Sequence, residues 1–132
     1  MMKKIIIVFA LLAFLSCKKE EKTTIDNSEA SIEESASDVK TPKELGKEIF
    51  EGKGNCTSCH QPDQKVIGPS IQEIAKIYKD KNGDIVTFLK GKGEPIVDPS
   101  QFDVMKTNFP ITQAMSDEEL KAIETYIYSH LK

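Results

Sequence analysis

The sequence contains no arginine and no tryptophan, and its supply of hydrophobic side chains is small. All 18 basic residues are lysines, so the chain has no guanidinium group for bidentate binding of phosphate or carboxylate. The net charge of −3 is too modest to indicate a nucleic-acid partner. Hydrophobic residues make up 39% and aromatic residues 7% of the chain. One small domain of this composition usually needs a disulfide, a metal or a cofactor to stabilise its core.

The N-terminus combines a basic start, Lys3 and Lys4, with an uninterrupted apolar run from Ile5 to Leu15. As a helix this run would be about 16 Å long, against about 30 Å for the hydrocarbon core of a bilayer. We therefore predict that residues 1–16 are an export signal rather than a membrane span. The segment FLSC resembles a bacterial lipobox, which implies cleavage before Cys17 and lipidation of that cysteine. The alternative is an ordinary signal peptide followed by an unpaired cysteine.

Residues 17–40 are interpreted as the lipidated cysteine followed by a tether. Residues 18–40 are rich in Ser, Glu and Lys, poor in large apolar residues, and free of Gly and Pro. Such a segment cannot bury enough surface to offset its ordering entropy, so we predict disorder, with a short solvated helix over residues 28–37 as the alternative. The protein is therefore expected to be exported and held by acyl chains on a bacterial membrane, facing the periplasm or the cell surface.

The folded domain is expected to span residues 41–132, with a helix at each end. Thr41 and Glu44 form a capping-box pattern that predicts a helix beginning at Pro42 and ending near Gly52 or Gly54. Ser116 and Glu119 predict a terminal helix in the same way. That helix would carry an apolar stripe and would place His130 in its last turn. The stripe consists of Leu120, Ile123, Ile127 and Leu131.

Two shorter helices are predicted between these ends, over residues 70–80 and 83–91. No segment has a sustained alternation of apolar and polar residues, so the domain is predicted to be all-α. Residues 91–115 are expected to form one long loop. So long a loop in so small a domain needs something to pack against, and a cofactor is the most economical choice.

The segment Cys56-Thr57-Ser58-Cys59-His60 has the Cys-x-x-Cys-His pattern of c-type haem attachment. The two thiols would form thioethers with the vinyl groups of the porphyrin. His60 would then lie under the ring and bind iron through Nε2, while its Nδ1–H needs an acceptor.

Three alternatives fit the same cysteines less well. A thioredoxin-like redox pair follows a strand in an α/β fold, whereas a helix precedes this motif. A zinc site needs four ligands, and the only Cys and His residues of the domain are Cys56, Cys59, His60 and His130. In the last turn of a helix, His130 is more often a surface residue favoured by the helix dipole. A disulfide between Cys56 and Cys59 would close a very short loop and stabilise the chain little.

Residues 41–132 resemble the small single-haem c-type cytochromes of class I. The resemblance implies a small cytochrome c fold of three to five helices, with long loops wrapped around one covalently bound haem. It also implies that the Pro69 carbonyl accepts from Nδ1 of His60, and that the terminal helices cross where Gly46 approaches Tyr126. The matching segments are GKEIF (46–50), CTSCH (56–60), IGPSI (67–71), MKTN (105–108) and MSDEELKAIETYIYS (115–129).

Two methionines are candidates for the sixth iron ligand. Met115 directly precedes the Ser116 cap, where a hydrophobic staple with Leu120 is expected, so its predicted role is packing. Met105 lies in the long loop and could reach across the haem. With Asn108 it matches the Met-x-x-Asn pattern of the family, which implies that the Asn amide donates to the Met sulfur. We therefore favour Met105 over Met115.

Axial ligation by His and Met leaves iron no open position, which predicts a one-electron carrier rather than an enzyme with a small-molecule substrate. The expected partners of this monomer are respiratory redox proteins such as a terminal oxidase, a reductase or a quinol-oxidising complex. The alternative is a five-coordinate haem that senses a gas or reacts with peroxide. The predicted apolar pocket consists of Ile67, Ile71, Ile74, Phe88, Leu89, Ile96, Val97 and Phe109.

Overall fold

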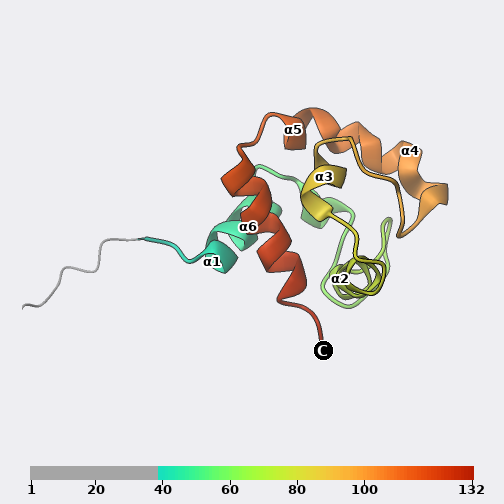
Figure 1. The fold of residues 1–132 in the computed structure, drawn as a ribbon, viewed down its shortest axis with the longest axis horizontal. Coiled ribbons are helices and arrows are strands. Elements are labelled where there is room, and N and C mark those ends of the chain that lie inside the picture. Colours follow the sequence, from blue (N-terminus) through green and yellow to red (C-terminus); the bar gives the residue numbers. More distant parts are fainter. Residues whose placement is uncertain (1–38) are drawn as a thin grey trace, which may run out of the picture. The chain divides into compact units, whose positions relative to one another are not determined.

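A computed structural model describes residues 39–132, which form six α-helices and three short 3₁₀ helices (Figure 1). Within these residues no strand occurs, and one isolated antiparallel bridge pairs His60 with Lys65. The predicted all-α class is confirmed. The elements are α1 (Pro42–Glu51), η1 (Cys56–Ser58), α2 (Ile71–Asp80), α3 (Ile85–Leu89), η2 (Pro99–Gln101), α4 (Phe102–Met105), η3 (Lys106–Asn108), α5 (Phe109–Gln113) and α6 (Asp117–Tyr128).

The export signal over residues 1–16, the lipidation of Cys17 and most of the tether fall outside the described residues. In the part of the chain that the structure covers, none of the helices has the length and hydrophobicity needed to cross a membrane.

The long helices begin where their cap residues predict. The Thr41 hydroxyl accepts from the backbone N–H of Glu44, and the Glu44 carboxylate accepts from the backbone N–H of Thr41. Ser116 and Glu119 form the same reciprocal pair at the start of α6. Ser70 caps α2 through the backbone N–H of Glu73. Each cap satisfies donors that the first turn of a helix leaves without partners.

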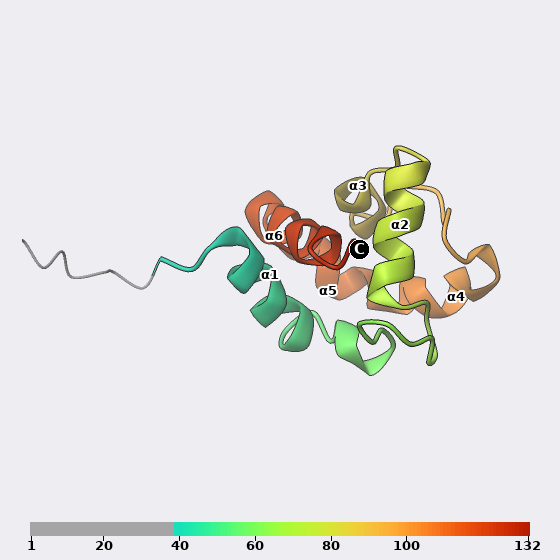
Figure 2. The same ribbon diagram turned by 90° about the horizontal axis from the view of Figure 1, so that it is seen from below.

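Helices α1 and α6 cross in close contact, and both views show them side by side (Figures 1 and 2). At the crossing, a Cβ atom on Gly46 would lie 1.9 Å from the carbonyl oxygen of Ala122 and 2.9 Å from Cβ of Tyr126. The two backbones can approach this closely only because Gly46 has no side chain. The crossing expected at Gly46 and Tyr126 is confirmed. Beside it, the rings of Phe50 and Tyr126 pack with their centroids 5.3 Å apart.

The prediction of one long loop over residues 91–115 is wrong. The chain there forms η2, α4, η3 and α5 in succession, which Figure 1 shows as the orange segment. Pro99 and Pro110 lie in the first turn of η2 and of α5, where proline is well tolerated because no N–H is needed. Helices of three to five residues carry no detectable helical periodicity, so the sequence pattern could not reveal them.

The terminal helix is shorter than its apolar stripe predicts. It ends at Tyr128, so His130 lies beyond the helix and not in its last turn. The Ser129 hydroxyl donates to the Tyr126 carbonyl, and tight turn hydrogen bonds follow from His130 and Leu131 to the last carbonyls of the helix. His130 packs edge-on against the ring of Tyr126, with the centroids 4.8 Å apart.

Candidate cofactor site

The two cysteines and His60 lie in one tight turn that follows α1. Asn55 adopts a left-handed backbone with φ of 52°, which redirects the chain into η1. The backbone N–H groups of Cys59 and His60 both donate to the Cys56 carbonyl, at 3.1 and 3.0 Å. This turn brings both sulfurs and the imidazole to the wall of a single cavity.

The imidazole of His60 is held in one orientation. Its Nδ1 lies 2.8 Å from the Pro69 carbonyl oxygen, so Nδ1–H donates there and Nε2 is left with its lone pair. Gly68 packs against the ring, because a Cβ on this residue would lie 2.5 Å from Cε1 of His60. Burial lowers the pKa of His60, although the hydrogen bond to Pro69 acts in the opposite direction. The lowered pKa favours the neutral imidazole, which is the form that binds metals.

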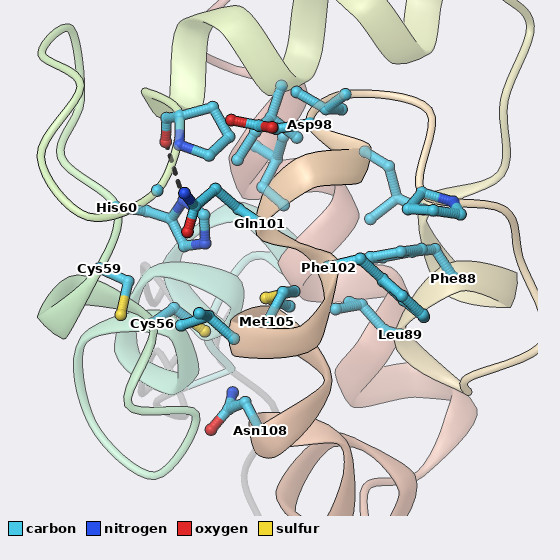
Figure 3. A pocket seen from close by; sticks show the side chains of 18 of the residues that line it. Cys56, Cys59, His60, Phe88, Leu89, Asp98, Gln101, Phe102, Met105 and Asn108 are labelled. Atoms are coloured by element: carbon cyan, nitrogen blue, oxygen red, sulfur yellow. Dashed lines mark hydrogen bonds between the residues drawn. The ribbon is translucent and has the colours of Figure 1, made fainter.

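The cavity has a volume of about 200 Å³, and most of its walls are apolar (Figure 3). Six of the eight predicted pocket residues line it; Ile71 lies in the core outside the lining, and Phe109 packs behind Phe102. A second group of wall residues, from α1, α2, α3, α4 and α6, was not predicted from the sequence. These are Phe50, Tyr78, Ile85, Phe102, Val104, Ile123 and Ile127.

The structure separates the two candidate methionines. Met105, at the end of α4, lines the cavity, and its sulfur lies on the side where His60 and Cys56 project (Figure 3). Met115 is buried in the core, with 9% of its surface exposed, and does not line the cavity. Its burial together with Leu120 is consistent with a staple at the start of α6.

Asn108 also lines the cavity, but its hydrogen bond differs from the one implied by the resemblance. Its Nδ2 donates to the Gly54 carbonyl at 2.9 Å. In the described residues it forms no hydrogen bond with the Met105 sulfur. The amide therefore ties η3 to the turn that precedes Cys56.

Asp98 and Gln101 are among the polar residues of the cavity wall that were not predicted. Asp98 accepts from the hydroxyl of Ser100 at 2.6 Å and from the ammonium of Lys65 at 3.0 Å. These two contacts hold the pKa of the Asp98 carboxyl below its usual range. No local pattern in the sequence marks Asp98, because Lys65 lies 33 residues away.

The environment of the Cys56 thiol differs from that of a reactive redox pair. Cys56 and Cys59 are both free, and burial raises the pKa of the Cys56 thiol to about 11. A reactive dithiol needs a lowered pKa instead. The described residues contain no group of three or more His, Cys, Asp or Glu side chains that could hold a metal ion. His130 packs against Tyr126 and is not among the cavity residues.

The donor set fits the haem that the sequence pattern indicates. Cys56 and Cys59 present two thiols to an apolar cavity, and His60 presents an imidazole whose Nδ1 is already engaged by the Pro69 carbonyl. Met105 adds a thioether to the same cavity. Large apolar walls suit the faces of a porphyrin, and a nitrogen–sulfur pair suits its iron.

Comparison with known proteins identifies relatives of this chain. Residues 43–130 match the model of the family described as "Cytochrome c". Curated relatives include cytochrome c-552 of Nitrosomonas europaea, 50% identical over 40 residues, which are 30% of this chain and 38% of the relative. Cytochrome c2 of Rubrivivax gelatinosus is 51% identical over 43 residues, which are 33% of this chain and 45% of the relative. The matched stretches thus span less than half of each of these relatives. The family match and the Cys56–Cys59 pair show that this chain belongs to the cytochrome c family, whose members bind haem c covalently through such a pair.

Proposed function

We propose that this protein is a one-electron carrier, with haem attached at Cys56 and Cys59 and its iron ligated by His60 and Met105. One observation carries the proposal. These four side chains come from two segments far apart in the sequence, and they border the same apolar cavity. Nε2 of His60 is available for iron because Nδ1 donates to Pro69.

Each protein group has a definite effect on the iron. Bound haem supplies reversible one-electron chemistry between ferrous and ferric iron. The thioether of Met105 is a soft ligand that favours the reduced ion and raises the reduction potential. The apolar walls exclude water and disfavour the extra positive charge of the oxidised state, which acts in the same direction. His60 and Met105 would together fill the positions at the iron that a substrate would need.

The mouth of the cavity supports electron exchange through a short-lived protein contact. Ile67 and Val104 both line the cavity, yet they are 56% and 49% exposed. Apolar side chains at the rim allow a partner to approach the cofactor without desolvating charges. Contacts between redox proteins are small and transient. The expected partners are a terminal oxidase, a reductase or a quinol-oxidising complex.

The N-terminal segment would hold the carrier at a membrane. Acyl chains on Cys17 and the tether up to residue 40 would raise the local concentration of the haem domain near membrane-bound partners. The variant Cys17→Ala should appear in the soluble fraction or keep its signal segment. Incorporation of labelled fatty acid by this variant would contradict the anchor.

Absorption spectra of the haem-loaded protein test the proposed function. The reduced protein in alkaline pyridine should show the band position of a haem with saturated vinyl groups. The ferric protein should be low-spin with a weak far-red band from Met sulfur to iron, and the ferrous protein should not bind carbon monoxide. A high-spin ferric spectrum with rapid binding of carbon monoxide would instead support the five-coordinate alternative, a gas sensor or peroxide-reactive haem.

A further inference from the structure

Of the two proposed iron ligands, His60 is held in place by more contacts than Met105. His60 lies in a loop closed by several hydrogen bonds, including Nδ1 to Pro69 at 2.8 Å and Gly68 N–H to the Cys59 carbonyl at 2.9 Å. The backbone of Lys65 pairs with that of His60 in the isolated bridge, so Lys65 belongs to the same closed unit. The part of the cavity wall that contains His60 is therefore fixed by hydrogen bonds within its own loop.

The part of the cavity wall that contains Met105 is formed by η2, α4 and η3, and fewer contacts hold it in place. Helix α4 has only four residues, and its main backbone neighbours are η2 and η3, which adjoin it in the chain. A single helical turn is unstable by itself. Phe102 gives it an apolar anchor, with its ring 6.3 Å from that of Phe88 and 6.0 Å from that of Phe109, and Met105 is only partly buried where it packs against the core. The adjoining η3 adds one hydrogen bond, from Asn108 to the Gly54 carbonyl. Val104 and Thr107, on either side of Met105, are exposed.

One ion pair joins the two walls. Nζ of Lys65 lies 3.0 Å from Oδ2 of Asp98, the residue that begins the turn into η2 and α4. The Asp98 side chain is 18% exposed and lines the cavity, and its other oxygen accepts from Ser100. Among the ion pairs of the described residues, this is the only one with a member in the cavity wall.

We propose that Lys65 and Asp98 are positioning residues, forming a clasp between the two walls that keeps Met105 within reach of the iron. The clasp rests on the proposed ligation by His60 and Met105. Lys65 is fixed to the His60 wall by its backbone, and Asp98 is fixed to η2 by the Ser100 hydroxyl, so the contact limits how far the weaker wall can move away. Without it, the state in which Met105 has left the iron becomes more populated.

An added imidazole, which replaces Met105 at ferric iron, measures that population. Its apparent Kd equals the intrinsic Kd divided by the fraction of molecules with Met105 detached. Exposed ion pairs have small coupling energies, so Lys65→Gln and Asp98→Asn in the haem-loaded protein should each lower the apparent Kd about three- to fivefold. The double variant should resemble the single ones, and the swap Lys65→Asp with Asp98→Lys should recover most of the wild-type value.

The chain offers a matched control. Lys53 and Glu119 form another ion pair between distant segments, with side chains 53% and 27% exposed, and neither lines the cavity. Lys53→Gln and Glu119→Gln change the charge in the same way and should leave the apparent Kd for imidazole unchanged. Thermal unfolding of all variants separates a local effect on Met105 from a general loss of stability.

The possible results of these measurements lead to different conclusions. A wild-type protein with the far-red Met band, in which Lys65→Gln affects imidazole binding no more than Lys53→Gln does, would overturn the clasp alone. Additive effects of Lys65→Gln and Asp98→Asn would also overturn it, because coupled residues should not be additive. A wild-type protein without the Met band would overturn the proposed ligation and the clasp with it.

Discussion

At the scale of single residues, the orientation of His60 depends on two neighbours that follow it in the chain. Pro69 fixes which nitrogen carries the proton, and Gly68 leaves the space in which the ring lies. The Pro69 contact was implied by the resemblance, and the structure contains it at 2.8 Å. The role of Gly68 was not foreseen, because nothing in the local pattern distinguishes a glycine under a ring from a glycine in a turn.

The variant Gly68→Ala tests this packing. Its Cβ would lie 2.5 Å from Cε1 and 2.8 Å from Nδ1 of His60, so the ring or the loop must shift. Because overpacking a core costs about 1–3 kcal/mol, we expect the free energy of unfolding of the haem-loaded protein to fall by that amount. Denaturant unfolding followed by circular dichroism measures it. Gln64→Ala, an exposed change in the same loop, should stay within about 0.5 kcal/mol of wild type.

The sequence could predict those functional residues that lie close together in the chain and form a recognisable motif. Cys56, Cys59 and His60 form a recognisable run, and all three border the cavity. Asp98 could not be predicted, because its significance comes from a fold that brings residue 65 to residue 98. Asn108 shows the limit of resemblance. The position lines the cavity as expected, yet its amide donates to Gly54.

At the scale of elements, the crossing of α1 and α6 connects the cofactor site to the rest of the core. Phe50 on α1 and Ile123 and Ile127 on α6 line the cavity and are also buried in the core. The caps of both helices were predictable because capping is a local property of a few adjacent residues. The short helices between residues 99 and 113 were not, since their conformation depends on packing against other elements.

The variant Gly46→Ala tests the crossing. Alanine would favour the helix by about 1 kcal/mol on intrinsic propensity, but its Cβ would lie 1.9 Å from the Ala122 carbonyl oxygen. The helices must then separate, so we expect a net destabilisation of about 1–3 kcal/mol. Lys43→Ala, at an exposed position of the same helix, is the control. Equal unfolding midpoints for the two variants would contradict the close crossing.

At the scale of the whole molecule, the core and the cavity wall share many of their residues. Seven core side chains also line the cavity, namely Phe50, Cys56, Tyr78, Ile85, Leu89, Ile123 and Ile127. Apolar walls of this kind stabilise the fold only when something apolar covers them. The expectation that the domain needs a cofactor to pack on thus has a structural basis, even though the long loop on which it was based is partly helical.

The protein produced without haem attachment should therefore be largely unfolded. The cavity walls would face water, and a domain of this size has little other apolar surface to bury. Far-ultraviolet circular dichroism during a thermal scan measures this. A cooperative transition with the helix content of the haem-loaded protein would show that the core is sufficient without the cofactor.

The most direct test of the account is the far-red absorbance of the ferric protein in two methionine variants. Met105→Ala should abolish the band from sulfur to iron and lower the reduction potential, because Met105 lines the cavity and is the soft ligand that we propose for the iron. Met115→Leu should keep the band and cost less than about 1.5 kcal/mol of stability, as a volume-conserving change in the core does. If Met105→Ala keeps the band and Met115→Leu loses it, the proposed ligation is wrong.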